Sequence, residues 1–439
     1  MCPDGLLLPE TAARRFLASL TKPTRILVAI SGGSDSTGLL LALVEALKAI
    51  PNSKISLRAV TVDHTLRAES AEEAREVAAF CSSLGIPHLV KVWQGEKPKS
   101  GIMAAARDAR YQLLADVAKR LKADIVVTGH TADDQRETLA MRKERSEQAS
   151  TGIADLVLFD RSLWIARPLL GCRREAIRDF LRARQVAWID DPSNDDPKYE
   201  RVRVRLRLAG EAEVASGADG AIVRAALATS AGRWLHQYFA LHSPWIGQVM
   251  PAGLADRETL CYAVPRLAAV FGGQAFPLGR KQTDDVLGLV ESGKPGRMTA
   301  GRVVFDLRRD GLFLVRESRG ILPLTLTPGA RGLWDSRFLV ENGSSDDITI
   351  LAGQHGPVSG RLPRDVVRRA LAAAPRIVDF AGEDPLASVG EKVRITPYFS
   401  PFDRFLTRFD FIFADSLAAA FGTRPYPKPP LGLIDGKSI

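Results

Sequence analysis

Cysteine is scarce in this chain. Its 439 residues include 4 cysteines, at Cys2, Cys81, Cys172 and Cys261, and no two of them form a CxxC pair. The wide spacing excludes the paired-cysteine zinc motifs and does not indicate a disulfide framework. It fits a reducing compartment, so we expect a cytoplasmic protein.

Long apolar runs are also missing. No run approaches the roughly 20 residues that span a bilayer, and Met1–Lys22 lacks the basic start and long apolar core of a signal peptide. We therefore expect no membrane association, and we find no sequence that indicates a stable protein partner. The length predicts two or three domains, and the net charge of +9 permits a nucleic-acid partner without requiring one.

The most informative stretch is RILVAISGGSDSTG, Arg25–Gly38. The apolar run Ile26–Ile30 predicts a buried parallel strand, and leucines at helical spacing follow from Leu39. The intervening glycines allow close approach to the main chain, and a helix N-terminus attracts anions such as phosphate. The residues predicted to bind this anion are Ser31, Gly32, Gly33, Ser34, Asp35 and Ser36.

This turn is not a Walker P-loop, because no lysine ends it. It could be a plain glycine-rich turn in which Ser34, Asp35 or Ser36 caps the helix. The string Ser-Gly-Gly-x-Asp-Ser, however, resembles the pyrophosphate-binding loop of the N-type ATP pyrophosphatases. That resemblance implies cleavage of ATP to AMP and pyrophosphate, and hence adenylation.

Strands alternate with helices after this turn. Strands are expected at 55–62, 88–93 and 125–128, with helices at 69–84 and 102–121 between them. This alternation predicts an α/β fold, a doubly wound parallel sheet of the Rossmann-like, PP-loop type. We expect domains at 1–210 (catalytic), 211–319 (mainly helical) and 320–439 (mixed α+β). The helical domain should end in a hairpin, Val303–Arg316, which turns at Asp310-Gly311.

Three further motifs follow the loop, and a fifth stretch supports them. They are VDHTLRAES at 62–70, ARDARY at 106–111 and GHTADDQRET at 129–138, followed by RPLL at 167–170 with WIDDPSN at 188–194. Together, in this order and spacing, they resemble the tRNA(Ile)-lysidine synthetase family over about residues 24–208. The resemblance implies that ATP and free lysine convert the wobble cytidine of a tRNA(Ile) CAU anticodon to lysidine, which changes decoding from AUG to AUA.

The resemblance implies roles at the nucleotide. Asp35 would bind Mg²⁺, which takes carboxylate oxygens, although a helix cap is an open alternative. Arg110 would supply positive charge at the α-phosphate. His130, at a strand end, would contact phosphate or help proton movement, since histidine titrates near neutral pH. Asp63 and His64 would shape the adenosine pocket or simply form a loop.

Asp134 is predicted to bind the ammonium of free lysine, with Glu137 one turn later as a helper. A carboxylate meets the need to hold the ammonium, and it could also take its proton. Helix capping is the alternative for Asp133 and Asp134, because both begin a helix.

Residues 161–210 hold 12 Lys and Arg against 7 Asp and Glu. Such clusters provide sequence-independent phosphate contacts, while a solvated face with ion pairs is the alternative. The pattern at 201–207 fits an edge strand by its period and a helix by the family resemblance. The residues predicted to contact tRNA are Arg173, Arg174, Arg201, Arg203 and Arg205.

Two departures from the family pattern keep other functions open. The glycine-rich loop expected after the GHTADDQ helix keeps only Gly152 within 142–156, and Val202 replaces an amide. A tRNA thiolase of the same superfamily is one alternative, but such enzymes commonly use paired cysteines. A nucleotide-binding RNA chaperone without catalysis is the other.

Overall fold

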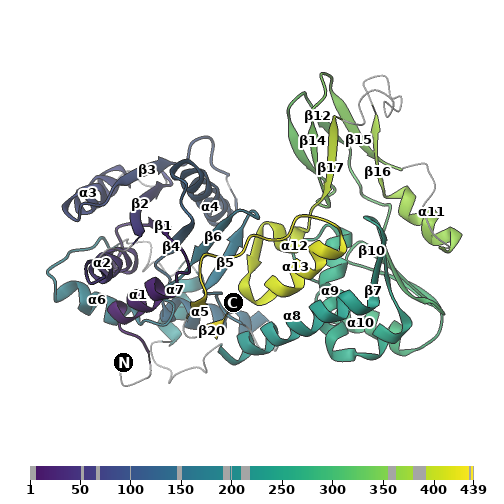
Figure 1. Cartoon of the computed structure of the whole chain (residues 1–439), viewed down its shortest axis with the longest axis horizontal. Helices are drawn as coiled ribbons and strands as arrows, with labels where there is room; N and C mark the ends of the chain where they lie inside the picture. Colours follow the sequence, from purple (N-terminus) through teal and green to yellow (C-terminus); the bar gives the residue numbers. More distant parts are fainter. Residues whose placement is uncertain are drawn as a thin grey trace. The chain divides into compact units, whose positions relative to one another are not determined.

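The computed structural model describes residues 6–50, 54–65, 70–98, 100–145, 151–190, 198, 200–208, 218–353, 362–378, 392–434 and 437–438. The chain forms two compact units: unit 1 is Met1–Val223 with Pro427–Ile439, and unit 2 is Arg224–Tyr426 (Figure 1). None of the helices in these ranges is both long and apolar enough to cross a bilayer.

Unit 1 is built on a mostly parallel sheet. Its helices are α1 (Pro9–Ala18), α2 (Ser34–Lys48), α3 (Ser70–Ser83), α4 (Ile102–Leu121), α5 (Ala132–Arg145), α6 (Arg174–Arg182) and α7 (Glu200–Leu208), and α8 (Ala218–Tyr238) continues into unit 2. Its strands are β1 (Thr24–Ala29), β2 (Ile55–Asp63), β3 (His88–Val92), β4 (Ile125–Thr128), β5 (Leu156–Phe159), β6 (Leu163–Ala166), β19 (Leu433–Ile434) and β20 (Lys437–Ser438).

The strand order within unit 1 is β5-β6-β4-β1-β2-β3. All neighbours pair in parallel except β5 and β6, which form an antiparallel hairpin. Because the chain runs from β1 to β2 and β3 on one side and returns to β4 on the other, the topological switch point lies between β1 and β4. Ligands bind at the carboxyl ends of strands at such a point. The predicted α/β fold is confirmed.

The apolar sequences of the central strands are explained by their burial. Every residue of β4, β5 and β6 is buried, as expected for strands covered on both faces. The hairpin β5–β6 was not predicted, because its two short apolar runs carry no period that separates strand from helix. The arginine-rich stretch that could be either an edge strand or a helix by sequence forms helix α7 at 200–208.

Close helix packing positions the site. Helix α2 packs against α1 and α6. A Cβ at Gly38 of α2 would lie 2.3 Å from Cγ2 of Ile177 in α6, so only glycine permits this separation. The packing brings the start of α6 beside the start of α2.

Unit 2 begins with helices around a five-stranded antiparallel sheet of order β7-β8-β11-β10-β9. These elements are β7 (Phe239–Ser243), β8 (Ile246–Val249), a 3-10 helix (Pro251–Ala255), α9 (Arg257–Gly272), α10 (Arg280–Glu291), β9 (Gly296–Ala300), β10 (Val303–Arg308) and β11 (Gly311–Arg316). Strands β10 and β11 form the hairpin predicted from Asp310-Gly311, and Gly311 takes a positive φ of 129°.

The rest of unit 2 holds two three-stranded sheets, β12-β15-β16 and β13-β14-β17, with further helices. The elements are β12 (Leu324–Leu326), β13 (Arg331–Trp334), β14 (Phe338–Asn342), β15 (Ile348–Ala352), α11 (Arg364–Ala372), β16 (Pro375–Val378), β17 (Val393–Pro397), α12 (Ser400–Asp403), β18 (Phe405–Thr407), a 3-10 helix (Arg408–Asp410) and α13 (Phe411–Ala420). Both expected domains beyond 210 thus lie largely within one compact unit, and the boundaries at 210 and 319 stay predictions.

A buried carboxylate, Asp410, connects the 3-10 helix at Arg408–Asp410 with helices α8 and α9 in unit 2. Asp410 accepts hydrogen bonds from Arg224 Nε at 2.9 Å and from the Tyr262 hydroxyl at 2.7 Å, and Arg266 lies 3.5 Å away. Burial alone would raise the pKa of Asp410, but Arg224 and Arg266 outweigh it and hold the pKa below its usual value. Removing this carboxylate would leave two largely buried guanidinium groups without their shared partner.

We expect Asp410→Asn to destabilise unit 2 by about 3–5 kcal/mol, the usual cost of breaking a buried ion pair. A depressed pKa means that the stabilisation is present above the unfolded value, about pH 4, and is lost as the pH falls through the folded value. Urea unfolding at pH 7 followed by tryptophan fluorescence would measure the loss. As a control, Asp284→Asn removes an exposed ion pair with Arg280 and should change stability by less than about 1 kcal/mol. An equally small effect of Asp410→Asn would contradict the expectation.

Candidate active site

Two loops meet at the switch point of the sheet in unit 1. Strands β1 and β4 are paired with Ala29 opposite Thr128, so the turns after them are neighbours. A Cβ at Gly129 would lie 2.8 Å from the backbone of Asp35 and Ser36, so this close approach requires glycine. The predicted anion loop and the predicted lysine-binding helix are therefore brought together.

The anion loop has the shape expected of it. Gly32 takes a φ of +89°, and Gly33 is the N-cap of α2. Since glycine has no side chain, it cannot accept hydrogen bonds from the N–H groups of the first turn. The Ser36 hydroxyl instead accepts from Ser31 N at 3.1 Å and donates to Gly33 O at 3.1 Å, which holds the loop closed on itself. The suggestion that Ser34, Asp35 or Ser36 caps the helix is thus wrong, because all three lie inside its first turn.

Asp35 projects from that first turn toward α6. Its Oδ2 lies 2.9 Å from Arg174 Nε, and its Oδ1 accepts from the Ser34 hydroxyl at 3.2 Å. Burial raises the pKa of Asp35 even though Arg174 opposes the shift. A carboxylate in this position, beside an anion loop, suits a divalent cation.

The described residues contain no group of three or more His, Cys, Asp or Glu that could hold a metal ion by themselves. Mg²⁺, however, is commonly held by one or two carboxylates together with substrate phosphates. Asp35 beside an anion loop fits that arrangement.

Asp134 has two separate functions in the structure. Its Oδ2 accepts from Thr131 N at 2.8 Å and from the Thr131 hydroxyl at 2.9 Å, which caps α5. Its Oδ1 faces Arg174 at 3.4 Å and Arg201 at 3.9 Å. The capping alternative is therefore correct for one oxygen and leaves the other for binding.

Glu137, one turn along α5, is almost fully buried, with 2% of its surface exposed. Its oxygens lie 2.9 Å from Arg201 Nε and 2.8 Å from Arg205 Nε, both on α7. Arg174 Nη1 lies 3.8 Å from the same carboxylate.

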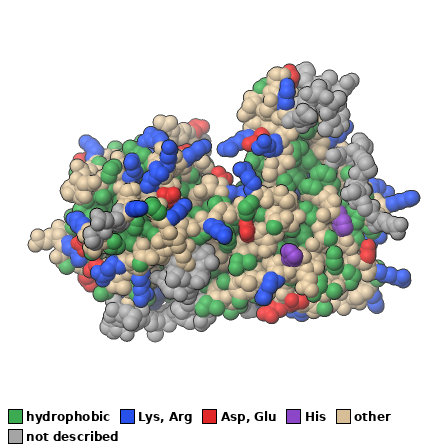
Figure 2. Space-filling model, viewed as in Figure 1, with side chains coloured by type: hydrophobic (Ala, Val, Ile, Leu, Met, Phe, Trp, Pro, Cys, Tyr) green, Lys and Arg blue, Asp and Glu red, His purple; other side chains and the backbone are tan. Residues whose placement is uncertain are grey.

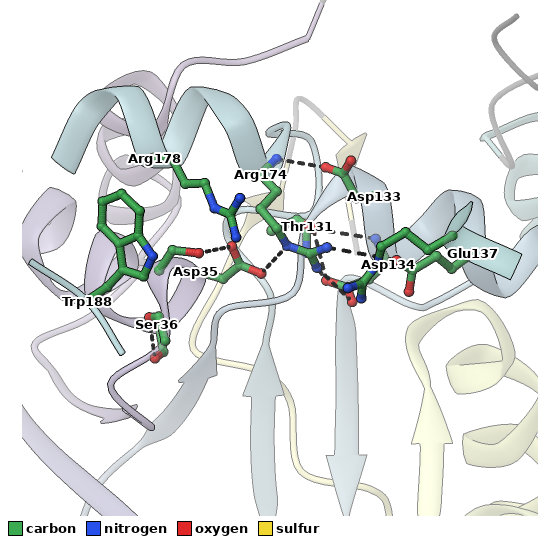
Figure 3. A network of polar contacts seen from close by, with 12 residues as sticks. Asp35, Ser36, Thr131, Asp133, Asp134, Glu137, Arg174, Arg178 and Trp188 are labelled. Carbon is green, nitrogen blue, oxygen red and sulfur yellow. Dashed lines mark hydrogen bonds and ion pairs between the residues drawn. The ribbon is translucent and has the colours of Figure 1, made fainter. Parts of the chain in front are cut away.

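Arg174 therefore bridges both loops, as Figure 3 shows. Its backbone N donates to Asp133 Oδ2 at 2.7 Å, which fixes the start of α6. Burial disfavours its charge, but Asp35 and Asp134 raise the pKa of Arg174 above its usual value. The sequence suggested only a contact to tRNA for this residue.

His130 lies at the end of β4, and its Nδ1 is 3.0 Å from the Thr128 hydroxyl. Burial, reinforced by Arg167, lowers the pKa of His130 to about 3. A lowered pKa leaves His130 neutral at pH 7, which favours the predicted contact with phosphate over the predicted help with proton movement.

His64 and Arg110 form a second group at the end of β2. Arg110 Nε donates to His64 Nε2 at 3.3 Å, and the His64 ring packs edge-on against Trp93, 5.9 Å away. Burial and Arg110 lower the pKa of His64 to about 4. Asp63 accepts from Thr65 N at 2.7 Å and so shapes the turn itself. Trp93 was not among the predicted site residues, although its position just after β3 parallels that of His64 after β2.

The arginines predicted to contact tRNA divide into two sets. Arg174, Arg201 and Arg205 reach the carboxylates of the site, whereas Arg203 is exposed and donates to Lys198 O at 2.9 Å. Arg173 is the N-cap of α6. On the face seen in Figure 2, Lys and Arg side chains are spread over the surface rather than gathered in one block.

Parts of the predicted motifs lie outside the described residues. These parts are 66–69, 146–150 and 191–197. Within the altered loop at 142–156, Arg142 Nη1 donates a hydrogen bond to Gly152 O at 2.9 Å.

Comparison with known proteins identifies the family. A family model for the PP-loop domain matches residues 8–212. The tRNA(Ile)-lysidine synthase of Rhizobium meliloti (strain 1021) is 41% identical over 438 residues, covering 95% of this chain and 96% of that protein. The tRNA(Ile)-lysidine synthase of Mesorhizobium japonicum is 39% identical over 429 residues, covering 92% and 94%.

Among solved structures, the U34-tRNA thiolase NcsA from Methanococcus maripaludis with its 4Fe-4S cluster matches 47% of this chain and 80% of its own. Its sequence identity with this chain is 18%, and the TM-score is 0.36. The relatives matched over nearly their whole length are lysidine synthases, so they favour that function over a tRNA thiolase or an inactive RNA-binding protein. They also confirm the resemblance found in the motifs. The chain belongs to the tRNA(Ile)-lysidine synthase family.

Proposed function

We propose that this protein joins free L-lysine to C2 of the wobble cytidine in the CAU anticodon of tRNA(Ile), at the expense of ATP. The observation that carries the proposal is the meeting of an anion loop and a carboxylate cluster at the β1–β4 switch point, in a chain of this family. Cytosine O2 would attack the α-phosphorus of ATP and release pyrophosphate. The lysine ε-amine would then attack C2 and release AMP.

The nucleotide would lie along the carboxyl ends of β1 and β2. Main-chain N–H groups and hydroxyls of Ser31–Ser36 would hold the pyrophosphate, which accords with the glycine N-cap of α2. Arg110 would stabilise the charge that develops at the α-phosphate, and the neighbouring His64, Asp63 and Trp93 would form the adenosine side of the pocket. Neutral His130 would donate a hydrogen bond to phosphate.

Mg²⁺ would be held by Asp35 together with phosphate oxygens. When bound, the ion would neutralise phosphate charge and orient the leaving pyrophosphate. The raised pKa of Asp35 supports this role, because a second positive charge would stabilise its ionised form.

The lysine ammonium would bind at Asp134 Oδ1 and Glu137. Burial tends to raise the pKa of Asp134, but Arg174 and the other neighbours hold it below its usual value. A carboxylate with a low pKa suits binding of the ammonium better than removal of its proton.

The tRNA would contact basic residues at the surface. The half-buried Arg173 and the exposed Arg203 are the candidates near the site, while Arg201 and Arg205 would act chiefly through Glu137. Parts of the chain beyond 210, which we expected as a helical domain to 319 and a mixed domain to 439, would grip the tRNA body. Such a reaction belongs in the cytoplasm, and it requires no membrane and no stable protein partner.

The test is direct. The protein is incubated with ATP, Mg²⁺, radiolabelled lysine and a tRNA(Ile) transcript with the CAU anticodon, beside a matched transcript with a UAU anticodon. We expect label on the first RNA only, and pyrophosphate exchange without lysine in its presence. Exchange without any lysine transfer would favour another nucleophile, and a lack of both would point to an inactive nucleotide-binding protein.

A further inference from the structure

Arg174 occupies the oxygens that substrate cations would need. Its guanidinium lies 2.9 Å from Asp35, 3.4 Å from Asp134 and 3.8 Å from Glu137 (Figure 3). Two of these carboxylates stand on α5 and the third on α2, so one side chain spans both halves of the proposed site. Only 18% of that side chain is exposed.

The charges of this cluster already balance. Asp35, Asp134 and Glu137 face three arginines, and each arginine lies within 4 Å of at least one of the carboxylates. These arginines are Arg174, Arg201 and Arg205. Adding a lysine ammonium would leave an excess positive charge in a largely buried place, which is costly. A bound triphosphate would supply the missing negative charge.

The distances also indicate which contacts of Arg174 can break. Its shortest contact is to Asp35, beside the anion loop, and its two longer ones are to the carboxylates of α5. Glu137 keeps its short pairs with Arg201 and Arg205 in either case. The guanidinium can therefore turn toward bound phosphates while its backbone stays held by Asp133.

We propose that Arg174 is a positioning residue that keeps the lysine subsite closed until a bound nucleotide draws its guanidinium toward the phosphates. The inference rests on the proposed function, in that Asp134 and Glu137 are taken as the lysine subsite. The two substrates would then bind in order, with lysine binding well only after ATP. The reason is that the Arg174 guanidinium and the lysine ammonium compete for Asp134 Oδ1.

Binding of radiolabelled lysine by equilibrium dialysis tests this order. For the wild-type protein, a non-hydrolysable ATP analogue with Mg²⁺ should tighten lysine binding by about tenfold or more. Reciprocity requires lysine to tighten binding of the analogue by the same factor. In Arg174→Met, lysine should bind tightly with or without the analogue, since its competitor is gone. Arg182→Met, on the same helix but exposed and paired with Glu175, should behave as wild type.

The outcomes separate this inference from the function on which it rests. Equal lysine affinity in the wild-type protein with and without the analogue would overturn the inference alone. No lysine binding under any condition, with tRNA present as well, would overturn the proposed function and the inference together. Should the melting curve show that Arg174→Met is unfolded, Arg174→Lys decides, because its single ammonium reaches fewer oxygens. That variant should lose most of the coupling, and wild-type coupling in it would refute the inference.

Discussion

Asp134→Asn should abolish transfer of lysine to the RNA while leaving ATP–pyrophosphate exchange close to wild type. The amide keeps the size of the side chain and can still accept from Thr131, so the start of α5 is preserved. It removes the negative charge that faces Arg174 and Arg201 and would bind the lysine ammonium. We expect the rate of transfer to fall roughly a hundredfold or more, as when an essential acid–base or charged group is lost. Single-turnover assays with labelled lysine would measure it.

The neighbouring residue provides a matched control. Asp133 accepts from the backbone of Arg174, a contact that an asparagine oxygen can replace. Asp133→Asn should therefore transfer lysine at nearly the wild-type rate. If Asp133→Asn and Asp134→Asn were equally impaired, the defect would lie in the helix starts and not in lysine binding.

Asp35→Asn should stop the first half-reaction, so that ATP–pyrophosphate exchange falls roughly a hundredfold or more. The loss is expected because Asp35 is the carboxylate beside the anion loop, and because an amide cannot supply the charge that Mg²⁺ requires. Lysine transfer should fall with it, since transfer needs the adenylated RNA. This pattern differs from that of Asp134→Asn, in which exchange survives.

Glu45→Gln tests whether any lost charge on α2 would have the same effect. Glu45 lies at the far end of that helix and pairs with Arg184 at 2.6 Å. Its variant should keep wild-type exchange. If Asp35→Asn exchanged at more than a third of the wild-type rate, Asp35 would not be the metal-binding group.

Much of the catalytic unit could be predicted because its signals are local. The run Ile26–Ile30 and the leucines after it specify a buried strand and a helix, and the glycines between them specify the turn. The short strands β5 and β6 were missed because runs of four apolar residues fit either kind of element. The hairpin at Val303–Arg316 was found because Asp-Gly is a strong turn signal.

The pairing of charges could not be predicted. Arg174, Arg201 and Arg205 occur in a basic stretch, and along the chain they are indistinguishable from Arg203, which is exposed. Which of them meets a carboxylate depends on how α6 and α7 pack against α2 and α5. The lowered pKa of His130 also depends on tertiary packing, because residues distant in the chain bury the ring and disfavour its charged form.

By itself, the sequence determined the parallel sheet, the anion loop after β1 and the family, since each depends on residue types at short spacing. Only the tertiary structure decided that Asp35, Asp134 and Glu137 share one arginine. Residues 35, 134 and 174 are brought together by the strand order of the sheet and by the glycine contacts at Gly38 and Gly129. These residues are far apart in the chain, and no local sequence pattern encodes contacts between them.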